Sequence, residues 1–316
     1  MVQTIGFGTA AIGRPQYINI RKQKALAFDH ESFVKSGIQV LDEAYRQGVR
    51  YFDTAPGYGL AEQLLIDWVT KKDDPEIEVA TKWGYTYTAN FDPNATIHEV
   101  KDHSIDQLNR QWKKSEQLLP YVTTLQIHSA TLDTGVLENE AVLERLSEIK
   151  TNQNIRIGLT TSGHNQNEVI RKALEIESNG VLLFDVFQMT YNILDQSILS
   201  VINELKTLKN RIVIKEAMAN GRVFRNERFP HYAAMYDLLE SIAIKYDVEV
   251  DAIALRFCMD SIFPFKVLSG AATSDQLAQN FQANNFVLSE EEINNLKSFR
   301  CDPREYWSER KQLPWN

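Results

Sequence analysis

Short apolar runs alternate with amphipathic stretches along the whole chain. Each run is rich in β-branched or aromatic residues and ends at a turn, after which the apolar positions take a helical spacing. The runs cover residues 4–8, 50–53, 77–82, 122–127, 155–159, 184–188, 212–215 and 265–268. Most are continuously apolar, which is typical of parallel strands whose outer face is covered. We therefore predict eight parallel strands, each followed by a helix.

The stretches between the runs carry signals of helix starts and ends. Between Val34 and Tyr45 apolar residues recur three and four positions apart, and Gly48 follows where a helix commonly ends. Thr273 and Ser289 each precede a Gln or Glu by three residues, which is the pattern of a capping box. These signals support the assignment of helices to the stretches between the strands.

The number of strand–helix units predicts the fold. About eight units in a chain of 316 residues are expected of a TIM barrel, the (β/α)8 fold. The alternative is a doubly wound open sheet, which usually carries G-x-G-x-x-G after its first strand. Residues 6–13, G-F-G-T-A-A-I-G, fit that spacing badly, and a long irregular segment at residues 14–29 precedes the first helix. We predict a single α/β barrel domain over residues 1–316.

Composition and charge narrow the class of protein. Hydrophobic residues make up 43% and charged residues 24%, with a mean hydropathy of −0.33, values that exclude fibrous and largely disordered chains. The net charge of −8 and the pI near 5.4 argue against binding to nucleic acid. Because the chain shows neither a membrane-spanning apolar stretch nor a signal peptide, and holds only two well-separated cysteines, we expect a cytoplasmic protein with reduced thiols.

Polar side chains stand at many of the predicted strand ends. These residues are Asp53, Lys82, His128, Thr160, Gln188 and Lys215. Each alone has an ordinary structural explanation, such as a cap, a solvated strand end or a loop histidine. Catalytic groups of a TIM barrel sit at the carboxyl ends of its strands, however, so the joint pattern predicts an active site there.

Five segments in order resemble motifs of the aldo-keto reductase family. Residues 51–59, Y-F-D-T-A-P-G-Y-G, resemble its F-D-T-A-x-x-Y-G signature, residues 80–84 its lysine strand, and residues 125–129 its histidine strand. Residues 188–192 resemble its sixth-strand motif, and residues 269–280 its late G-A-x-x-x-x-Q-L-x-x-N cofactor segment. The resemblance covers about residues 4–290. It implies a TIM barrel and an NAD(P)-dependent oxidoreductase that transfers a hydride between a nicotinamide and a carbonyl, with reduction favoured.

The resemblance assigns four catalytic residues. Tyr58 is expected to be the general acid in reduction and the base in oxidation. Lys82 is expected to lower the pKa of that tyrosine, and Asp53 to hold Lys82 in place. His128 is expected to orient the substrate oxygen through a hydrogen bond. This chemistry needs no metal, and the sequence shows no cluster of metal-ligating residues.

Cofactor residues are also implied by the resemblance. They are Thr9, Thr160, Thr161, Gln188, Lys215, Gly270, Ala271, Ser274, Gln276 and Asn280. Lys215 stands where many relatives stack an aromatic ring on the nicotinamide. Because a lysine cannot stack in that way, Lys215 could instead pair with the adjacent Glu216. The family majority favours NADP(H), although the late segment lacks the Lys or Arg that often binds the 2′-phosphate, so NAD(H) is possible.

Aromatic residues near the strand ends suggest substrate contacts. Trp83 and Tyr85 follow the lysine strand and are expected to flank the mouth of the site. The tail at about residues 300–316 carries Tyr306, Trp307 and Trp315, and it is expected to lie near the active-site face, either closing over the substrate pocket or packing on the barrel. The expected partner is a small carbonyl or alcohol, and the protein is expected to be a monomer or weak homo-oligomer.

Three alternative functions are compatible with a barrel of this kind. Residues 158–163 and the loop at residues 15–19 resemble aldose-dehydrogenase-like branches of the family, which implies as an alternative an NAD-dependent dehydrogenase of sugar-like alcohols. A cofactor-binding regulatory subunit of the same fold, such as the cytoplasmic partner of potassium channels, need not keep all four catalytic residue types. An unrelated metal-dependent hydrolase lacks its ligand clusters. The reductase is therefore the favoured prediction.

Overall fold

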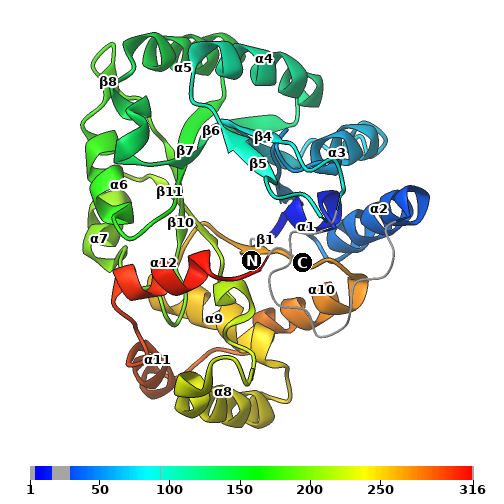
Figure 1. The fold of residues 1–316 in the computed structure, drawn as a ribbon, viewed down its shortest axis with the longest axis vertical. Helices are drawn as coiled ribbons and strands as arrows, with labels where there is room; N and C mark the ends of the chain where they lie inside the picture. Colours follow the sequence, from blue (N-terminus) through cyan, green and yellow to red (C-terminus); the bar gives the residue numbers. More distant parts are fainter. Residues whose placement is uncertain (1–3, 16–28, 93, 315–316) are drawn as a thin grey trace.

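Eight parallel strands close into a barrel in the computed structural model, which describes residues 4–15, 29–92 and 94–314 (Figure 1). In chain order the barrel strands are β1 (Ile5–Gly8), β2 (Tyr51–Asp53), β3 (Glu78–Trp83), β6 (Val122–Ala130), β7 (Arg156–Thr161), β10 (Val186–Thr190), β11 (Arg211–Lys215) and β12 (Lys266–Ser269). Each pairs with the next, and β12 pairs with β1. The predicted TIM barrel is confirmed, and each predicted strand overlaps one observed strand. Most of the loop at residues 15–19, and Trp315, lie outside the described residues.

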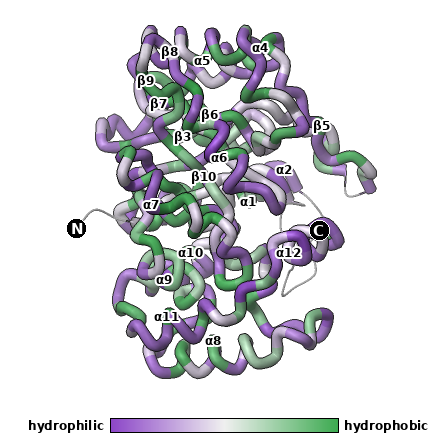
Figure 2. Tube along the Cα trace, turned by 90° about the vertical axis from the view of Figure 1, so that its left-hand side faces the viewer, coloured by the Kyte–Doolittle hydropathy of each residue, from purple (hydrophilic) through white to green (hydrophobic). Residues whose placement is uncertain are grey.

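Helices surround the barrel and cover its outer face (Figure 1). Those that follow the strands are α2 (His30–Arg46), α3 (Ala61–Val69), α4 (Ile105–Ser115), α5 (Glu140–Gln153), α6 (Gln166–Leu174), α7 (Leu199–Thr207), α9 (Val250–Ile262) and α10 (Ser274–Phe281). Further helices are α1 (Ala10–Gly13), α8 (Ala233–Tyr246), α11 (Glu290–Lys297) and α12 (Pro303–Lys311). Figure 2 shows hydrophobic segments mainly on the strands and on the inner sides of this layer, as expected for helices that bury one face.

The helix signals of the sequence have structural counterparts. Helix α2 ends just before Gly48, whose φ of +89° is readily adopted only by glycine. Ser289 and Glu292 form a complete capping box at the start of α11. At α10 the Thr273 side chain accepts a hydrogen bond from the Gln276 amide, which is one half of the predicted box.

Two short hairpins interrupt the strand–helix order. One consists of β4 (Tyr85–Tyr87) and β5 (Glu99–Lys101), which pair antiparallel between β3 and α4. The other consists of β8 (Glu177–Ser178) and β9 (Val181–Leu182), between α6 and β10. Neither hairpin was predicted. The β4–β5 hairpin contacts the carboxyl end of β6, and it therefore helps to build the site described below.

The inside of the barrel has an apolar floor. It is formed by Tyr51, Ala80, Val186, Val213 and Leu268, which all come from barrel strands. Because side chains alternate along a strand, the residues two positions after Tyr51 and Ala80 also point inward, closer to the carboxyl ends. The fold thus places two charged side chains directly above an apolar floor.

Among the described residues, no helix is long and apolar enough to cross a membrane.

Candidate active site

A buried ion pair joins the ends of β2 and β3. Lys82 Nζ lies 2.5 Å from Asp53 Oδ2 and donates a further hydrogen bond to the Thr54 carbonyl, 3.0 Å away. Both charged side chains are almost fully buried. The second carboxylate oxygen of Asp53 accepts from Gln188 Nε2 at 2.6 Å and from Gln126 Nε2 at 3.4 Å. Asp53 is therefore well supplied with donors, and it holds the ammonium of Lys82 in one place.

Tyr58 lies beside this pair on the loop that follows β2. Its hydroxyl is 3.3 Å from Nε2 of His128, and the two rings meet edge to face at a centroid distance of 5.3 Å. The Lys82 ammonium is 4.7 Å from the centre of the Tyr58 ring. Only 7% of Tyr58 is exposed. The structure thus brings Asp53, Tyr58, Lys82 and His128 together, although they come from three different strand ends and a loop.

A bulge in β6 turns His128 toward Tyr58. The pairing of β6 with β7 shifts by one residue between Ile127 and Ala130, so β6 holds one extra residue there. Ser129 takes the left-handed conformation, with a φ of +52°, and its amide donates to Thr160 Oγ1 at 2.7 Å. A bulge re-aims the side chains of its strand. The sequence shows the histidine at the strand end but not the bulge that orients it.

Burial sets the protonation of the two hydrogen-bonding groups. Burial raises the pKa of Tyr58 well above its usual value, the charge of Asp53 raises it further, and Arg14 acts in the opposite direction. Lys82, which is expected to lower this pKa, lies 4.7 Å from the centre of the Tyr58 ring, and its effect on Tyr58 stays a prediction. Burial, followed by the charges of Lys82 and Arg14, lowers the pKa of His128 well below its usual value. At neutral pH, Tyr58 therefore keeps its proton and His128 is neutral.

The two expected substrate residues have different surroundings. The Tyr85 ring is half-buried and lies 4.8 Å from the His128 ring, where it flanks the candidate catalytic residues. Trp83 is only 1% exposed, belongs to the main core, and packs 5.5 Å from the His103 ring. The expectation for Trp83 is therefore corrected. Because side chains alternate along β3, the residue after the inward-pointing Lys82 faces the outer layer.

Sequence analysis missed two charged residues beside Tyr58. Arg14, at the end of α1, is 2% exposed and lies 5.4 Å from the centre of the Tyr58 ring. It pairs with Glu99 of the β4–β5 hairpin at 2.7 Å. The two partners are 85 positions apart in the chain, so no local pattern could have indicated the pair.

Three threonines expected to bind cofactor use their hydroxyls within the chain. Thr9 Oγ1 donates to the Asp53 carbonyl at 3.0 Å, and Thr161 Oγ1 donates to Gln166 Oε1 at 2.9 Å. Thr160 Oγ1 accepts the hydrogen bond from the Ser129 backbone amide in the β6 bulge. All three side chains are buried. In this structure they fix the strand ends, as Gln188 fixes Asp53.

Lys215 ends β11 where an aromatic ring was expected from the family. Its Nζ donates to Thr190 Oγ1 at 2.8 Å, and it lies 3.8 Å from Glu216 Oε1, which agrees with the expected pairing. Burial lowers the pKa of Lys215. Glu216 also contacts Arg310 of α12 at 3.6 Å, and Trp307 of the same helix lies 5.8 Å from the Lys215 ammonium. The end of β11 is thus tied to the C-terminal helix.

The late segment forms an open turn before α10. Apart from its chain neighbours, no heavy atom of the described residues lies within 4 Å of a Cβ built on Gly270, whereas Ala271 is buried and Ser274 is half-buried. The side-chain oxygen Oε1 of Gln276 accepts a hydrogen bond from the Ala272 backbone amide at 2.9 Å. The turn leaves space for a ligand at the N-terminus of α10, where phosphate groups are commonly bound.

Asn280 supplies a test of whether a dinucleotide fits. Its Nδ2 donates to Ser269 Oγ at 2.9 Å, but its buried Oδ1 has no hydrogen-bond partner among the described residues. A buried acceptor without a partner suits a ligand donor such as the amino group of adenine. Together with the open turn at Gly270, this atom is compatible with a bound dinucleotide.

The C-terminal helix packs onto the barrel. Tyr306 is fully buried, and its hydroxyl accepts a hydrogen bond from Asn192 Nδ2 at 3.0 Å. Trp307 Nε1 donates to Asp195 Oδ2 at 3.0 Å. Of the two arrangements expected for the tail, the described part of it shows packing against the loop that follows β10.

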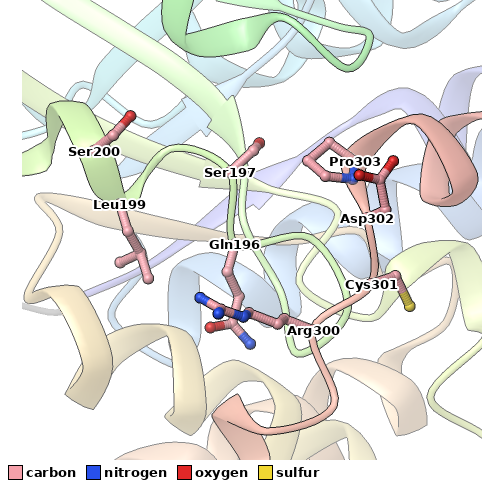
Figure 3. Close-up of a pocket in the computed structure, with 8 residues that line it drawn as sticks. All are labelled: Gln196, Ser197, Leu199, Ser200, Arg300, Cys301, Asp302 and Pro303. Carbon is pink, nitrogen blue, oxygen red and sulfur yellow. The ribbon is translucent and has the colours of Figure 1, made fainter.

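A cavity of about 440 Å³ lies between this loop and the segment that precedes α12 (Figure 3). It is lined by Gln196, Ser197, Leu199, Ser200, Arg300, Cys301, Asp302 and Pro303. Its described lining includes none of the expected site residues, so it is separate from the candidate catalytic residues.

Comparison with known proteins agrees with the motifs. The model of the Aldo/keto reductase family matches residues 4–300. The chain is 24% identical to pyridoxal 4-dehydrogenase of Microbacterium luteolum, with 88% of each chain covered. It is 25% identical to the NADH-specific methylglyoxal reductase of Escherichia coli strain K12, with 90% of this chain and 91% of that protein covered. The holo form of an aldo-keto reductase from Bacillus halodurans shares the fold, with a TM-score of 0.70 at 23% identity over 95% of this chain and 93% of that one.

Proposed function

The chain belongs to the aldo/keto reductase family, and from this premise we propose that it reduces a small aldehyde or ketone, with Tyr58 as the proton donor. Membership of the family makes the protein an NAD(P)-dependent oxidoreductase. One observation carries the more specific proposal: the Tyr58 hydroxyl lies 3.3 Å from His128 Nε2, beside the Lys82–Asp53 pair. A proton donor and a fixed positive charge meet there, as carbonyl reduction requires.

The chain's own residues have distinct tasks. The nicotinamide cofactor supplies the hydride when it is bound. Tyr58 and His128 hold the carbonyl oxygen, and Tyr58 gives its proton to that oxygen as negative charge develops. Lys82 stabilises the phenolate that remains, and Asp53 keeps the ammonium in position. The raised pKa of Tyr58 supports reduction as the favoured direction, because the hydroxyl stays protonated at neutral pH.

The substrate class rests on the aromatic wall and on the relatives. Tyr85 offers an apolar ring 4.8 Å from the His128 ring, which suits a small organic carbonyl. The two curated relatives are named for methylglyoxal and pyridoxal, both of which are aldehydes. We therefore expect small aldehydes to be better substrates than large ketones.

The charges of α10 bear on the choice of cofactor. Residues 269–281 contain no Lys or Arg, and the first turn of α10 carries the exposed Asp275. A 2′-phosphate needs positive partners, and a nearby carboxylate repels it. Although the family majority favours NADP(H), these charges support NAD(H), and we propose that NAD(H) binds at least as tightly as NADP(H).

Two measurements test the proposed function. In the first, NADH and NADPH are titrated against the purified protein while the quenching of tryptophan fluorescence is followed. In the second, Tyr58→Phe is compared with Tyr236→Phe, which removes the hydroxyl of a buried tyrosine on α8. We expect Tyr58→Phe to lose turnover of aldehydes and to keep its affinity for the cofactor, while Tyr236→Phe stays active. Full activity of Tyr58→Phe would refute the role of Tyr58, and binding of neither cofactor would refute the proposed function.

A further inference from the structure

Arg14 is buried against the loop that carries Tyr58. One guanidinium nitrogen, Nη2, donates to the Gly57 carbonyl, and the other, Nη1, donates to Glu99 Oε2 at 2.7 Å. The guanidinium carbon lies 5.4 Å from the centre of the Tyr58 ring and 5.1 Å from that of Tyr87. Arg14 thus touches both the catalytic loop and the β4–β5 hairpin.

Close backbone packing fixes this position. Gly59 has a φ of +62°, and a Cβ added to it would overlap the Gly13 carbonyl and approach Arg14 Cγ to 3.2 Å. The Leu60 amide donates to the same Gly13 carbonyl at 3.0 Å. The segment before Arg14 therefore lies directly against the segment after Tyr58, and neither can shift without the other.

The charge of Arg14 is directed at Tyr58. A guanidinium packed on a ring favours negative charge on that ring, and its influence is strong where water is excluded. Glu99 supplies the partner that a buried arginine needs. Because Glu99 is 25% exposed, water offsets part of its charge, whereas Arg14 is 2% exposed and faces the tyrosine.

We propose that Arg14 is a positioning residue for Tyr58, holding its loop and ring in place and favouring the negative charge that Tyr58 carries after it gives up its proton. This inference rests on the proposed function. The role requires both terminal nitrogens of the guanidinium, because the Gly57 carbonyl and the Glu99 carboxylate that they bind lie on different segments. Lysine has the charge but cannot form the same fork.

The test compares Arg14→Met with Arg50→Met. Arg50 is a matched control, since it also packs on a tyrosine, 3.9 Å from the Tyr45 ring, and pairs with Asp74 at 2.8 Å, but it precedes β2 at the opposite end of the barrel. We expect Arg14→Met to lower kcat for an aldehyde by about 10- to 100-fold, with KM and the dissociation constant of the cofactor within about twofold of wild type. The kcat of Arg14→Lys should lie between those of Arg14→Met and wild type, and the kcat of Arg50→Met should equal that of wild type.

A second readout does not depend on turnover. Amide hydrogen exchange over residues 55–61 should become faster in Arg14→Met and not in Arg50→Met, because the clamp on the Gly57 carbonyl is lost. If Arg14→Met does not fold, Arg14→Lys carries both measurements.

Two results would overturn the proposal: a kcat within twofold of wild type, or parallel losses of kcat and cofactor affinity, which indicate a purely structural role. If the wild-type protein reduces no carbonyl, the proposed function fails, and the exchange rates alone then decide whether Arg14 positions Tyr58.

Discussion

Replacing Lys82 with methionine should damage both catalysis and folding, and the two effects can be separated. The Lys82–Asp53 pair is 2.5 Å long and buried, so Lys82→Met leaves the Asp53 carboxylate without its cation inside the barrel. Breaking a buried pair on one side typically costs 3–5 kcal/mol. We expect about 3 kcal/mol, because the amides of Gln188 and Gln126 still donate to Asp53. For a chain of this length, that corresponds to a fall in Tm of about 4–5 °C.

The double variant Asp53→Asn/Lys82→Met isolates the charge effect. It removes both charges, so it should be more stable than the sum of the single losses predicts, by about 1–3 kcal/mol. Thermal unfolding followed by circular dichroism measures all four proteins of the cycle. The activity should not recover with the stability, because Tyr58 still lacks its cation. We expect both Lys82→Met and the double variant to lose at least about 100-fold in kcat.

Two results would refute this reasoning. If the two single losses add up to the loss of the double variant, Lys82 and Asp53 are not energetically coupled. If the double variant regains activity together with stability, Lys82 serves the fold and has no electrostatic role toward Tyr58.

Three further predictions follow from the geometry. Gly59→Ala should lose most of its activity and several kcal/mol of stability. Gly135→Ala is the control, because Gly135 has nearly the same φ (+61° against +62°) but no described atom within 4 Å of an added Cβ, and it should lose only about 1 kcal/mol. Equal losses of stability in urea unfolding would contradict the close packing at Gly59. Burial lowers the pKa of His103 from 6.5 to about 4 and the pKa of His128 well below its usual value. As the pH falls, these histidines therefore bind protons in the unfolded chain before they do so in the folded protein. The free energy of unfolding should accordingly fall between pH 6.5 and 4. His103→Gln should make this fall shallower, and an unchanged slope would show that its burial is not responsible. Asp275→Arg should tighten NADPH binding at least about 10-fold relative to NADH in the fluorescence titration, and no change would show that the first turn of α10 does not face the 2′ position.

The strands and the four candidate catalytic residues could be predicted because their signals are local. A parallel strand covered by helices is a short, continuously apolar run, and the polar residue that ends it lies at the carboxyl edge of the barrel. Asp53, Lys82 and His128 were found in this way, and Tyr58 through its motif. The contacts among the four then follow from the closure of the barrel rather than from any further feature of the sequence.

The remaining parts of the site could not be predicted because they depend on contacts between distant segments. The Arg14–Glu99 pair joins the first loop to a hairpin of three-residue strands, which have too few residues for an alternating pattern. The bulge at Ser129 depends on a bond from the neighbouring strand, and a serine there gives no sign of a left-handed residue. Trp83 was misplaced for a simpler reason: its place after Lys82 indicated nearness to the site but not the face of the strand.

The arrangement of charges supports the proposed preference of the candidate site for reduction. Burial lowers the pKa of His128, and the charges of Lys82, Arg14 and Lys215 lower it further, so this histidine stays neutral. Burial and the charge of Asp53 keep the proton on Tyr58. A neutral imidazole beside a protonated phenol is ready to bind a carbonyl oxygen and to protonate it. Oxidation of an alcohol needs the opposite state, in which Tyr58 has lost its proton. On the proposed mechanism, reduction should therefore be fast at neutral pH, and oxidation should accelerate as the pH is raised toward the pKa of Tyr58.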